Sequence, residues 1–222
     1  MSLIKAQDIS KHYNNGEDVV EALTAINLEI EEGEFLALMG PSGSGKSTLL
    51  SILGALNPPT SGKLIIDEID VYALPSERQA DFRHEYVGFV FQQYQLIPYL
   101  TALENVMLPL SITSRSGKEQ REMAQRVLAR VGLESKSCRL PSQLSGGEQN
   151  RVAIARAIVN QPAIIFADEP TGSLDSKTAT ELLELFKALN HEGLTIIMVT
   201  HNPENLAWVN RTVYIRDGLL AQ

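Results

Sequence analysis

The chain has 222 residues, of which 44% are hydrophobic and 21% charged, and its formal net charge is −8. These proportions are typical of a globular protein, and the acidic balance argues against general nucleic-acid binding, which relies on Lys and Arg against phosphates. The single cysteine excludes an intrachain disulfide. No apolar run approaches the roughly 18 residues of a membrane-spanning helix, and no signal region opens the chain, so we expect a cytosolic protein.

Short apolar segments of strand length recur at residues 25–30, 35–39, 63–66, 87–91, 163–167, 195–199 and 212–215. In the first segment Ile26, Leu28 and Ile30 alternate with polar residues, which is typical of a half-buried strand. The segment at 163–167 is almost continuously apolar, which indicates a strand covered on both faces of a parallel sheet.

Helical patterns lie between several of these segments. Residues 48–53 form an apolar run, residues 119–131 place apolar side chains on one side of a polar helix, and residues 182–189 follow helical spacing before a glycine. Strand signals are weak between about residue 94 and residue 159. We therefore predict an α/β core made of residues 1–93 and 160–222, with an α-helical subdomain, residues 94–159, inserted between its halves.

The clearest motif is GPSGSGKS at residues 40–47, between a predicted strand and a predicted helix. It fits the P-loop pattern, in which glycines let backbone N–H groups surround phosphate oxygens at a helix N-terminus. Lys46 is predicted to reach the β- and γ-phosphates, and Ser47 to offer its hydroxyl to Mg²⁺. A chance glycine-rich turn is the alternative, and the flanking strand and helix argue against it. The other predicted phosphate-binding residues of this loop are Gly40, Ser42, Gly43, Ser44 and Gly45.

Two acids follow the apolar strand predicted at residues 163–167. Asp168 at the strand end is suited to hold Mg²⁺, and Glu169 to polarise an attacking water. A strand that simply ends in solvated acids is the alternative. The P-loop in the same chain favours the Mg²⁺-binding and catalytic interpretation.

Residues 144–149, with the sequence LSGGEQ, resemble the signature of ATP-binding cassette (ABC) proteins and lie between the P-loop and Asp168 in the order that this family uses. Nearly the whole chain resembles an ABC transporter ATPase subunit. Residues 87–92, 103–106 and 167–172 are most similar to the Lol-type lipoprotein-release and MacB-type efflux ATPases. The resemblance implies a single ABC ATP-binding domain over 1–222, with a P-loop NTPase core, an antiparallel β subdomain and an inserted α-helical subdomain.

The resemblance also implies roles for individual residues. Tyr13 lies where the family stacks an aromatic ring on adenine, and Thr48 where it contacts phosphate oxygens. Gln92 matches the glutamine that senses Mg²⁺ and the γ-phosphate. Asp175 matches a loop that crosses between subunits, and His201 matches the histidine that contacts the γ-phosphate.

Ser145, Gly146 and Gly147 precede a predicted helix, so they form a second small-residue helix N-terminus suited to a phosphate. The resemblance implies that this signature closes over the nucleotide of the other subunit. We therefore expect a head-to-tail homodimer with two ATP molecules between the subunits, joined by ATP and released by hydrolysis.

The leading hypothesis is an ATPase that drives a separate membrane permease, for export or for lipoprotein or lipid extraction. Residues 96–110 are the expected docking region, which would hold the protein at the cytoplasmic face of the membrane. An FtsE-like ATPase that regulates a membrane partner without transport is the alternative. Cytosolic ABC proteins of DNA repair or translation are disfavoured by the chain length and by the acidic charge.

Overall fold

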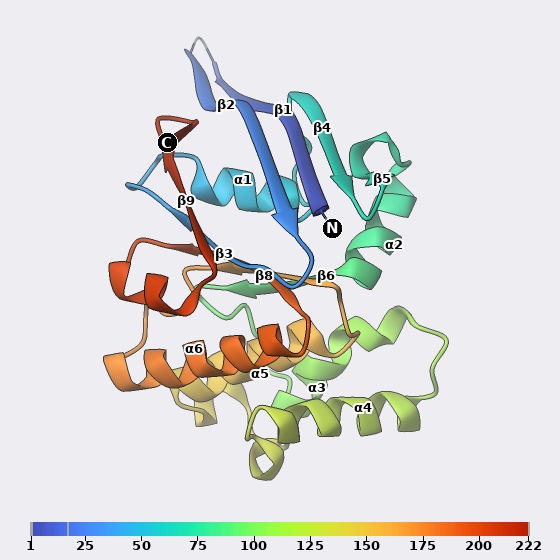
Figure 1. Ribbon diagram of the computed structural model, residues 1–222. Helices are drawn as coiled ribbons and strands as arrows, with labels where there is room; N and C mark the ends of the chain where they lie inside the picture. Colours follow the sequence, from blue (N-terminus) through green and yellow to red (C-terminus); the bar gives the residue numbers. More distant parts are fainter. Residues whose placement is uncertain (1, 17, 222) are drawn as a thin grey trace.

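Two sheets of different character meet across helix α1 (Lys46–Leu53) in the computed structural model, which describes residues 2–16 and 18–221 (Figure 1). The smaller sheet is antiparallel, and its strands follow the order β2 (Asp18–Glu31), β1 (Ser2–Asn15), β4 (Ser61–Ile66) and β5 (Ile69–Asp70). The larger sheet is parallel except at one edge, and its strands follow the order β10 (Leu219–Ala221), β9 (Arg211–Arg216), β3 (Phe35–Met39), β8 (Thr195–Thr200), β7 (Ile164–Asp168) and β6 (Val87–Phe91).

The remaining α-helices lie on the opposite side of the larger sheet from α1, or beside its β6 edge (Figure 1). They are α2 (Ser76–Tyr86), α3 (Ala102–Met107), α4 (Gly117–Arg130), α5 (Gly146–Ile158) and α6 (Ser176–His191). Short 3-10 helices lie in the connections between these helices and strands: η1 (Val71–Ala73), η2 (Leu108–Ile112), η3 (Glu134–Lys136), η4 (Pro141–Gln143) and η5 (Pro203–Trp208).

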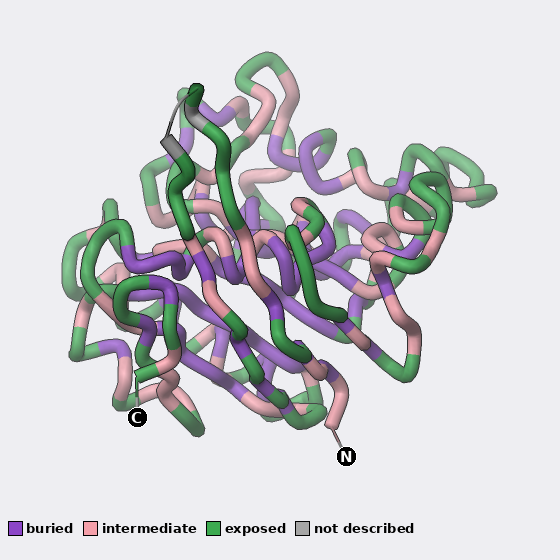
Figure 2. The backbone as a smooth tube through the Cα atoms, turned by 90° about the horizontal axis from the view of Figure 1, so that it is seen from above, coloured by how far each residue is buried: buried purple, intermediate pink, exposed green. Residues whose placement is uncertain are grey.

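The parallel strands are apolar on both faces because each face packs against a different core. In β8, Ile196 and Met198 contact the helical side, whereas Ile197 and Val199 contact the side of α1 and the antiparallel sheet. All four side chains are fully buried. Figure 2 shows the buried segments gathered at the centre of the molecule and the exposed segments at its margins. Successive side chains of a strand alternate between faces, so a doubly covered strand reads as a continuous apolar run.

The predicted fold class is confirmed, and each predicted strand corresponds to an observed one. The alternation at Ile26, Leu28 and Ile30 is also confirmed, because all three are buried on β2. Helices α3 to α5 follow one another between β6 and β7, while the boundaries at 93/94 and 159/160 stay a prediction. Across residues 2–16 and 18–221, no helix combines the length and the apolar character needed to cross a bilayer.

Candidate functional site

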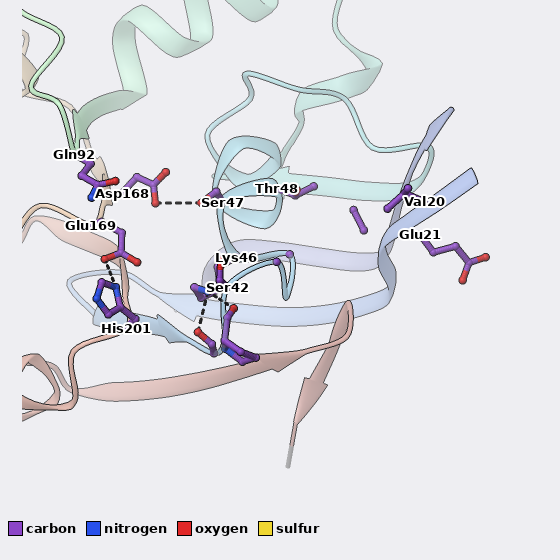
Figure 3. Close-up of a pocket in the computed structure, with 15 residues that line it drawn as sticks. Val20, Glu21, Ser42, Lys46, Ser47, Thr48, Gln92, Asp168, Glu169 and His201 are labelled. Carbon is purple, nitrogen blue, oxygen red and sulfur yellow. Dashed lines mark hydrogen bonds and ion pairs between the residues drawn. The ribbon is translucent and has the colours of Figure 1, made fainter. Parts of the chain in front are cut away.

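A cavity of about 660 Å³ opens where β3, β7 and β8 end, close to the hairpin of β1 and β2 (Figure 3). The carboxyl ends of parallel strands gather side chains from distant parts of the sequence at one edge of a sheet. The residues that line this cavity are Val20, Glu21, Ala22, Gly40, Pro41, Ser42, Gly43, Gly45, Lys46, Ser47, Thr48, Gln92, Asp168, Glu169 and His201.

The loop between β3 and α1 requires glycine for steric reasons. A Cβ on Gly40 would lie 2.0 Å from the carbonyl oxygen of Ile215. A Cβ on Gly45 would lie 2.5 Å from the carbonyl oxygen of Ala22, and its φ of +100° is a conformation that side chains disfavour. The backbone of this loop therefore packs directly on the chain around it, and its free side lines the cavity.

Helix α1 begins at the cavity without a side-chain cap. Gly45 precedes it and offers no side chain to the first N–H groups of the helix, and no acidic residue lies in the first turn. By contrast, Ser116, Ser145 and Asp175 each cap a later helix with a side-chain oxygen. The N-terminal N–H groups of α1 and the positive end of its dipole therefore remain available for an anion.

Lys46 adds a full positive charge to this helix N-terminus. Its ammonium donates hydrogen bonds to the carbonyl oxygens of Gly40 (2.9 Å) and Pro41 (2.7 Å), so its position is fixed by the loop itself. The residue is only 7% exposed. An ammonium has three N–H donors, so one is left for an anionic group in the cavity.

Ser47 and Asp168 bring two oxygen ligands together from opposite halves of the sequence. The Ser47 hydroxyl donates to Oδ1 of Asp168 at 3.3 Å. Burial raises the pKa of the Asp168 carboxyl, the Ser47 hydrogen bond lowers it, the charge of Glu169 raises it, and the charge of Lys46 lowers it. A half-buried carboxylate beside a hydroxyl and the Gln92 amide is the hard oxygen donor set that suits Mg²⁺.

Glu169 and His201 face each other across the carboxyl ends of β7 and β8 (Figure 3). Nδ1 of His201 lies 2.5 Å from Oε2 of Glu169. The Glu169 side chain is 18% exposed and the His201 side chain 67% exposed. The pair thus joins a sheltered carboxylate to an accessible imidazole, which is an arrangement suited to moving a proton at the cavity mouth.

The turn after Glu169 approaches the Gln92 side chain. A Cβ on Gly172 would lie 3.1 Å from Nε2 of Gln92 and 3.6 Å from Oε2 of Glu169. Glycine at position 172 therefore leaves room for both side chains at one end of the cavity.

Of the binding residues predicted on the P-loop side of the site, Tyr13 and Ser44 are not among those that line the cavity. Tyr13 pairs with Val20 across the β1–β2 hairpin, and Lys11 lies over its ring. Val20 and Glu21 do line the cavity, and the sequence reasoning missed both because nothing in the sequence revealed how the hairpin is paired. Ser44 is 3% exposed, and its hydroxyl oxygen has no hydrogen-bond partner within the part of the chain described here.

The predicted signature residues Ser145, Gly146 and Gly147 begin α5 outside the cavity. The Ser145 hydroxyl accepts the Glu148 N–H at 3.2 Å, and the Glu148 carboxylate accepts the Ser145 N–H at 2.8 Å. This capping box lowers the pKa of Glu148 mainly through the Ser145 N–H. A Cβ on Gly147 would lie 2.4 Å from Cγ2 of Thr178, so packing against α6 is a second reason for glycine there.

Asp175 also has a local role that the sequence reasoning missed. It is the N-cap of α6, because its carboxylate accepts the Thr178 N–H at 3.0 Å and the Thr178 hydroxyl at 2.7 Å. These bonds lower its pKa, the hydroxyl having the larger effect. An aspartate three residues before a threonine at the start of a helical pattern is the signal that could have revealed this cap.

Residues 96–110, the predicted docking region, divide between core and surface. Leu103, Val106 and Leu110 are buried among the helices. Tyr99 and Leu108 are 78% and 38% exposed, and they lie on the connection before α3 and at the start of η2. Cys138, between η3 and η4, is exposed.

Taken together, the cavity offers an open helix N-terminus, a fixed ammonium, an oxygen donor set for a cation and a carboxylate–imidazole pair. This combination can hold a polyphosphate with its counter-ion and direct a water at its end.

Known proteins are similar to this chain over nearly its whole length. The family model described as ABC transporter matches residues 23–172. YvrO, an ABC transporter ATP-binding protein of Bacillus subtilis, is 50% identical over 218 residues, which are 98% of this chain and 95% of that protein. MacB of Syntrophobacter fumaroxidans, a macrolide export ATP-binding/permease protein, is 50% identical over 223 residues, which are 99% of this chain but only 31% of MacB.

A solved structure is similar at the level of the backbone as well. The ATP-binding cassette MJ0796 of Methanocaldococcus jannaschii was solved as a dimer in a post-hydrolysis state bound to ADP and Pi. Its TM-score with this chain is 0.91 at 46% identity, and the match covers 99% of this chain and 97% of that one.

Proposed function

Because the chain belongs to the ABC transporter family as an ATP-binding subunit, we propose that it binds Mg²⁺-ATP in the cavity at α1 and uses its hydrolysis to drive a membrane permease. The observation that carries this proposal is the uncapped N-terminus of α1, which faces a cavity that also holds Lys46, Asp168, Glu169 and His201. An open helix N-terminus beside a fixed ammonium is an anion site, and the acids beyond it supply the means of hydrolysis.

In this proposal the P-loop N–H groups and Lys46 hold the phosphates, and Thr48 adds its hydroxyl. Ser47, Asp168 and Gln92 hold Mg²⁺, which when bound neutralises the phosphate charge. The hydroxyl, carboxylate and amide of these three residues fit the preference of Mg²⁺ for oxygen ligands. Tyr13, beside Val20 at the hairpin, is assigned to the adenine ring.

Glu169 is the proposed general base. Its sheltered carboxylate accepts a proton from the water that attacks the γ-phosphate, and the products are ADP and inorganic phosphate. His201, in contact with Oε2 of Glu169, holds that carboxylate in place and is itself accessible to the terminal phosphate. The two residues thus act as a unit at the cavity mouth.

The second half of the site comes from another copy of the chain. Ser145, Gly146 and Gly147 lie outside the cavity of their own chain, so an ATP held here leaves the signature free to close on the ATP of a partner. Asp175 and its loop would lie beside this contact. We therefore infer a head-to-tail homodimer that ATP stabilises, and MJ0796, 46% identical, forms a dimer.

The permease would dock at the exposed side chains of Tyr99 and Leu108, which leave apolar surface on the helical side of the molecule. This contact would place the chain on the cytoplasmic face of the membrane. Export or extraction of a lipoprotein or lipid is the proposed direction, supported by MacB relatives that are 45–50% identical and carry permease and ATP-binding parts in one chain.

The test compares the purified protein with its Glu169→Gln variant. We expect the variant to bind ATP with unchanged affinity, to lose hydrolysis by about a hundredfold or more, and to elute as an ATP-dependent dimer in size-exclusion chromatography. Glu184→Gln, which removes an exposed charge from α6, is the matched control and is expected to hydrolyse ATP normally. Normal hydrolysis by Glu169→Gln would overturn the assigned role of Glu169.

The partner is identified by purifying the tagged protein from its native membrane. A permease with few membrane helices and a large extracytoplasmic domain would support the hypothesis of export or extraction. A partner bound to the cell wall, with ATPase activity that responds to it and to no transported substrate, would support the regulatory alternative.

A further inference from the structure

A buried amide connects the two segments that carry Glu169 and His201. Asn205 lies in η5 and is 2% exposed. Its Nδ2 group donates one hydrogen bond to the hydroxyl of Thr171 at 2.9 Å and another to the hydroxyl of Thr200 at 2.8 Å. Both N–H donors of the amide are therefore used, one on each segment.

The two threonines are close neighbours of the reacting pair. Thr171 follows Glu169 by two residues, and Thr200 immediately precedes His201. Thr171 is 8% exposed and Thr200 is 1% exposed, so water cannot easily replace the amide as their partner. Because a single nitrogen holds both hydroxyls, Asn205 joins the two segments through their side chains.

The backbone of Glu169 needs such a constraint. Its φ is +49°, in the left-handed region that a glutamate disfavours. A strained residue keeps such a conformation only where the surrounding structure fixes it on several sides. The Glu169 N–H donates to the carbonyl oxygen of Val199, and its carbonyl oxygen accepts from Gly172. The Asn205–Thr171 bond fixes the turn between these two points.

The position of Asn205 is itself well determined. Asn202 caps η5 by accepting the Glu204 N–H at 3.0 Å, and Pro203 opens the helix. The backbone N–H of Asn202 donates to the same Thr200 hydroxyl at 3.1 Å. The amide is thus held by the end of β8 and by its own short helix.

We propose that Asn205 is a positioning residue for ATP hydrolysis, which holds the Glu169 carboxylate within reach of His201 by bridging Thr171 and Thr200. This role rests on the proposed function, because it presupposes that the Glu169–His201 pair serves hydrolysis. It predicts that breaking the bridge slows the chemical step and spares ATP binding, since Asn205 lies outside the residues that line the cavity.

The test uses a pair of variants at the acceptor. Thr171→Val keeps the shape of the side chain and removes the hydroxyl, whereas Thr171→Ser keeps the hydroxyl. We expect Thr171→Val to lower kcat by about tenfold or more, because a small displacement of a catalytic group has a large effect on rate. The Kd for ATP should stay within about twofold, and Thr171→Ser should restore most of the rate.

Asn205→Ala and the double variant Asn205→Ala/Thr171→Val, together with Thr171→Val and the wild type, form a double-mutant cycle. Because both changes break the same bond, the double variant should be no slower than the slower single variant. Thr180→Val is the matched control, since its exposed hydroxyl donates to the carbonyl oxygen of Ser176 one turn earlier in α6. All rates are measured well below the midpoint of thermal unfolding, which is determined for every variant.

A Thr171→Val protein that is folded and keeps its kcat would overturn the proposal, as would an equal loss in Thr171→Ser. The proposal would also be overturned if the two single losses of kcat multiplied in the double variant, or if a rise in the Kd for ATP accounted for the loss of activity. An inactive wild-type protein, or a fully active Glu169→Gln variant, would instead refute the proposed function itself.

Discussion

Substituting Gly88 by alanine tests how closely β6 and α5 approach each other. An added Cβ would lie 2.4 Å from the carbonyl oxygen of Ala157, 3.0 Å from its carbonyl carbon and 3.2 Å from its Cβ. None of these atoms is the end of a flexible side chain, so the helix or the strand must move. Such overpacking costs about 1–3 kcal/mol. In a protein of this size, that corresponds to a fall in Tm of about 2–12 °C.

The assay is thermal unfolding of the nucleotide-free protein, followed by circular dichroism. Gly117→Ala is the matched control, because Gly117 opens α4 and an added Cβ would meet no atom within 4 Å. Alanine is the better helix former, so the control should unfold at the same temperature or higher. Equal midpoints for Gly88→Ala and the wild type would refute the argument that β6 and α5 touch through backbone at this position.

Three further predictions concern charges and caps. Asp168→Asn should abolish Mg²⁺-dependent hydrolysis and raise the Tm of the nucleotide-free protein at neutral pH. Burial raises the pKa of Asp168, so its ionised form disfavours folding. The difference in Tm between the variant and the wild type should therefore shrink as the pH falls through that raised pKa. Asp175→Ala should lower the Tm at neutral pH, whereas Asp175→Asn, which can still cap α6, should not. The hydrogen bonds to Thr178 lower the pKa of Asp175, so the ionised carboxylate stabilises the fold at pH values above the usual pKa of an aspartate. This stabilisation is lost as the pH falls through the lowered pKa. Ser145→Arg should prevent the ATP-dependent dimer in size-exclusion chromatography, whereas Ser145→Ala, which loses the same cap, should still dimerise; a dimer of the arginine variant would contradict the shared site.

The parallel strands could be predicted because both of their faces are buried, so the apolar run is unbroken. Strand β1 was less visible for a definite reason. Ile4 and Ala6 are buried at alternate positions, but the next buried residue is Ile9, three positions on. Asp8 has a φ of +50°, and the pairing with β2 shifts between Ala6 and Ile9. This bulge reverses the alternation within the strand, and a period of two no longer fits the sequence.

Helix α2 was not predicted because its side chains are mostly polar and Phe82 alone among them is buried. The phosphate loop and the acids after β7 were visible because each is a contiguous motif whose flanking elements can also be predicted. The Asn205 bridge could not be predicted in this way, because Thr171 lies 34 positions away in the sequence and Thr200 is the last residue of an ordinary apolar strand. No spacing in the sequence distinguishes that asparagine from the polar residues around it.

Cys138 gives the chain one native attachment point for a spectroscopic probe. It is exposed, the sequence contains no other cysteine, and it lies seven residues before Ser145, in the connection that leads through η4 to α5. A nitroxide on this thiol requires no prior removal of cysteines. In a head-to-tail pair related by a two-fold axis, two such labels define a single distance, so pulsed electron resonance could follow opening and closing during turnover in the unmutated protein.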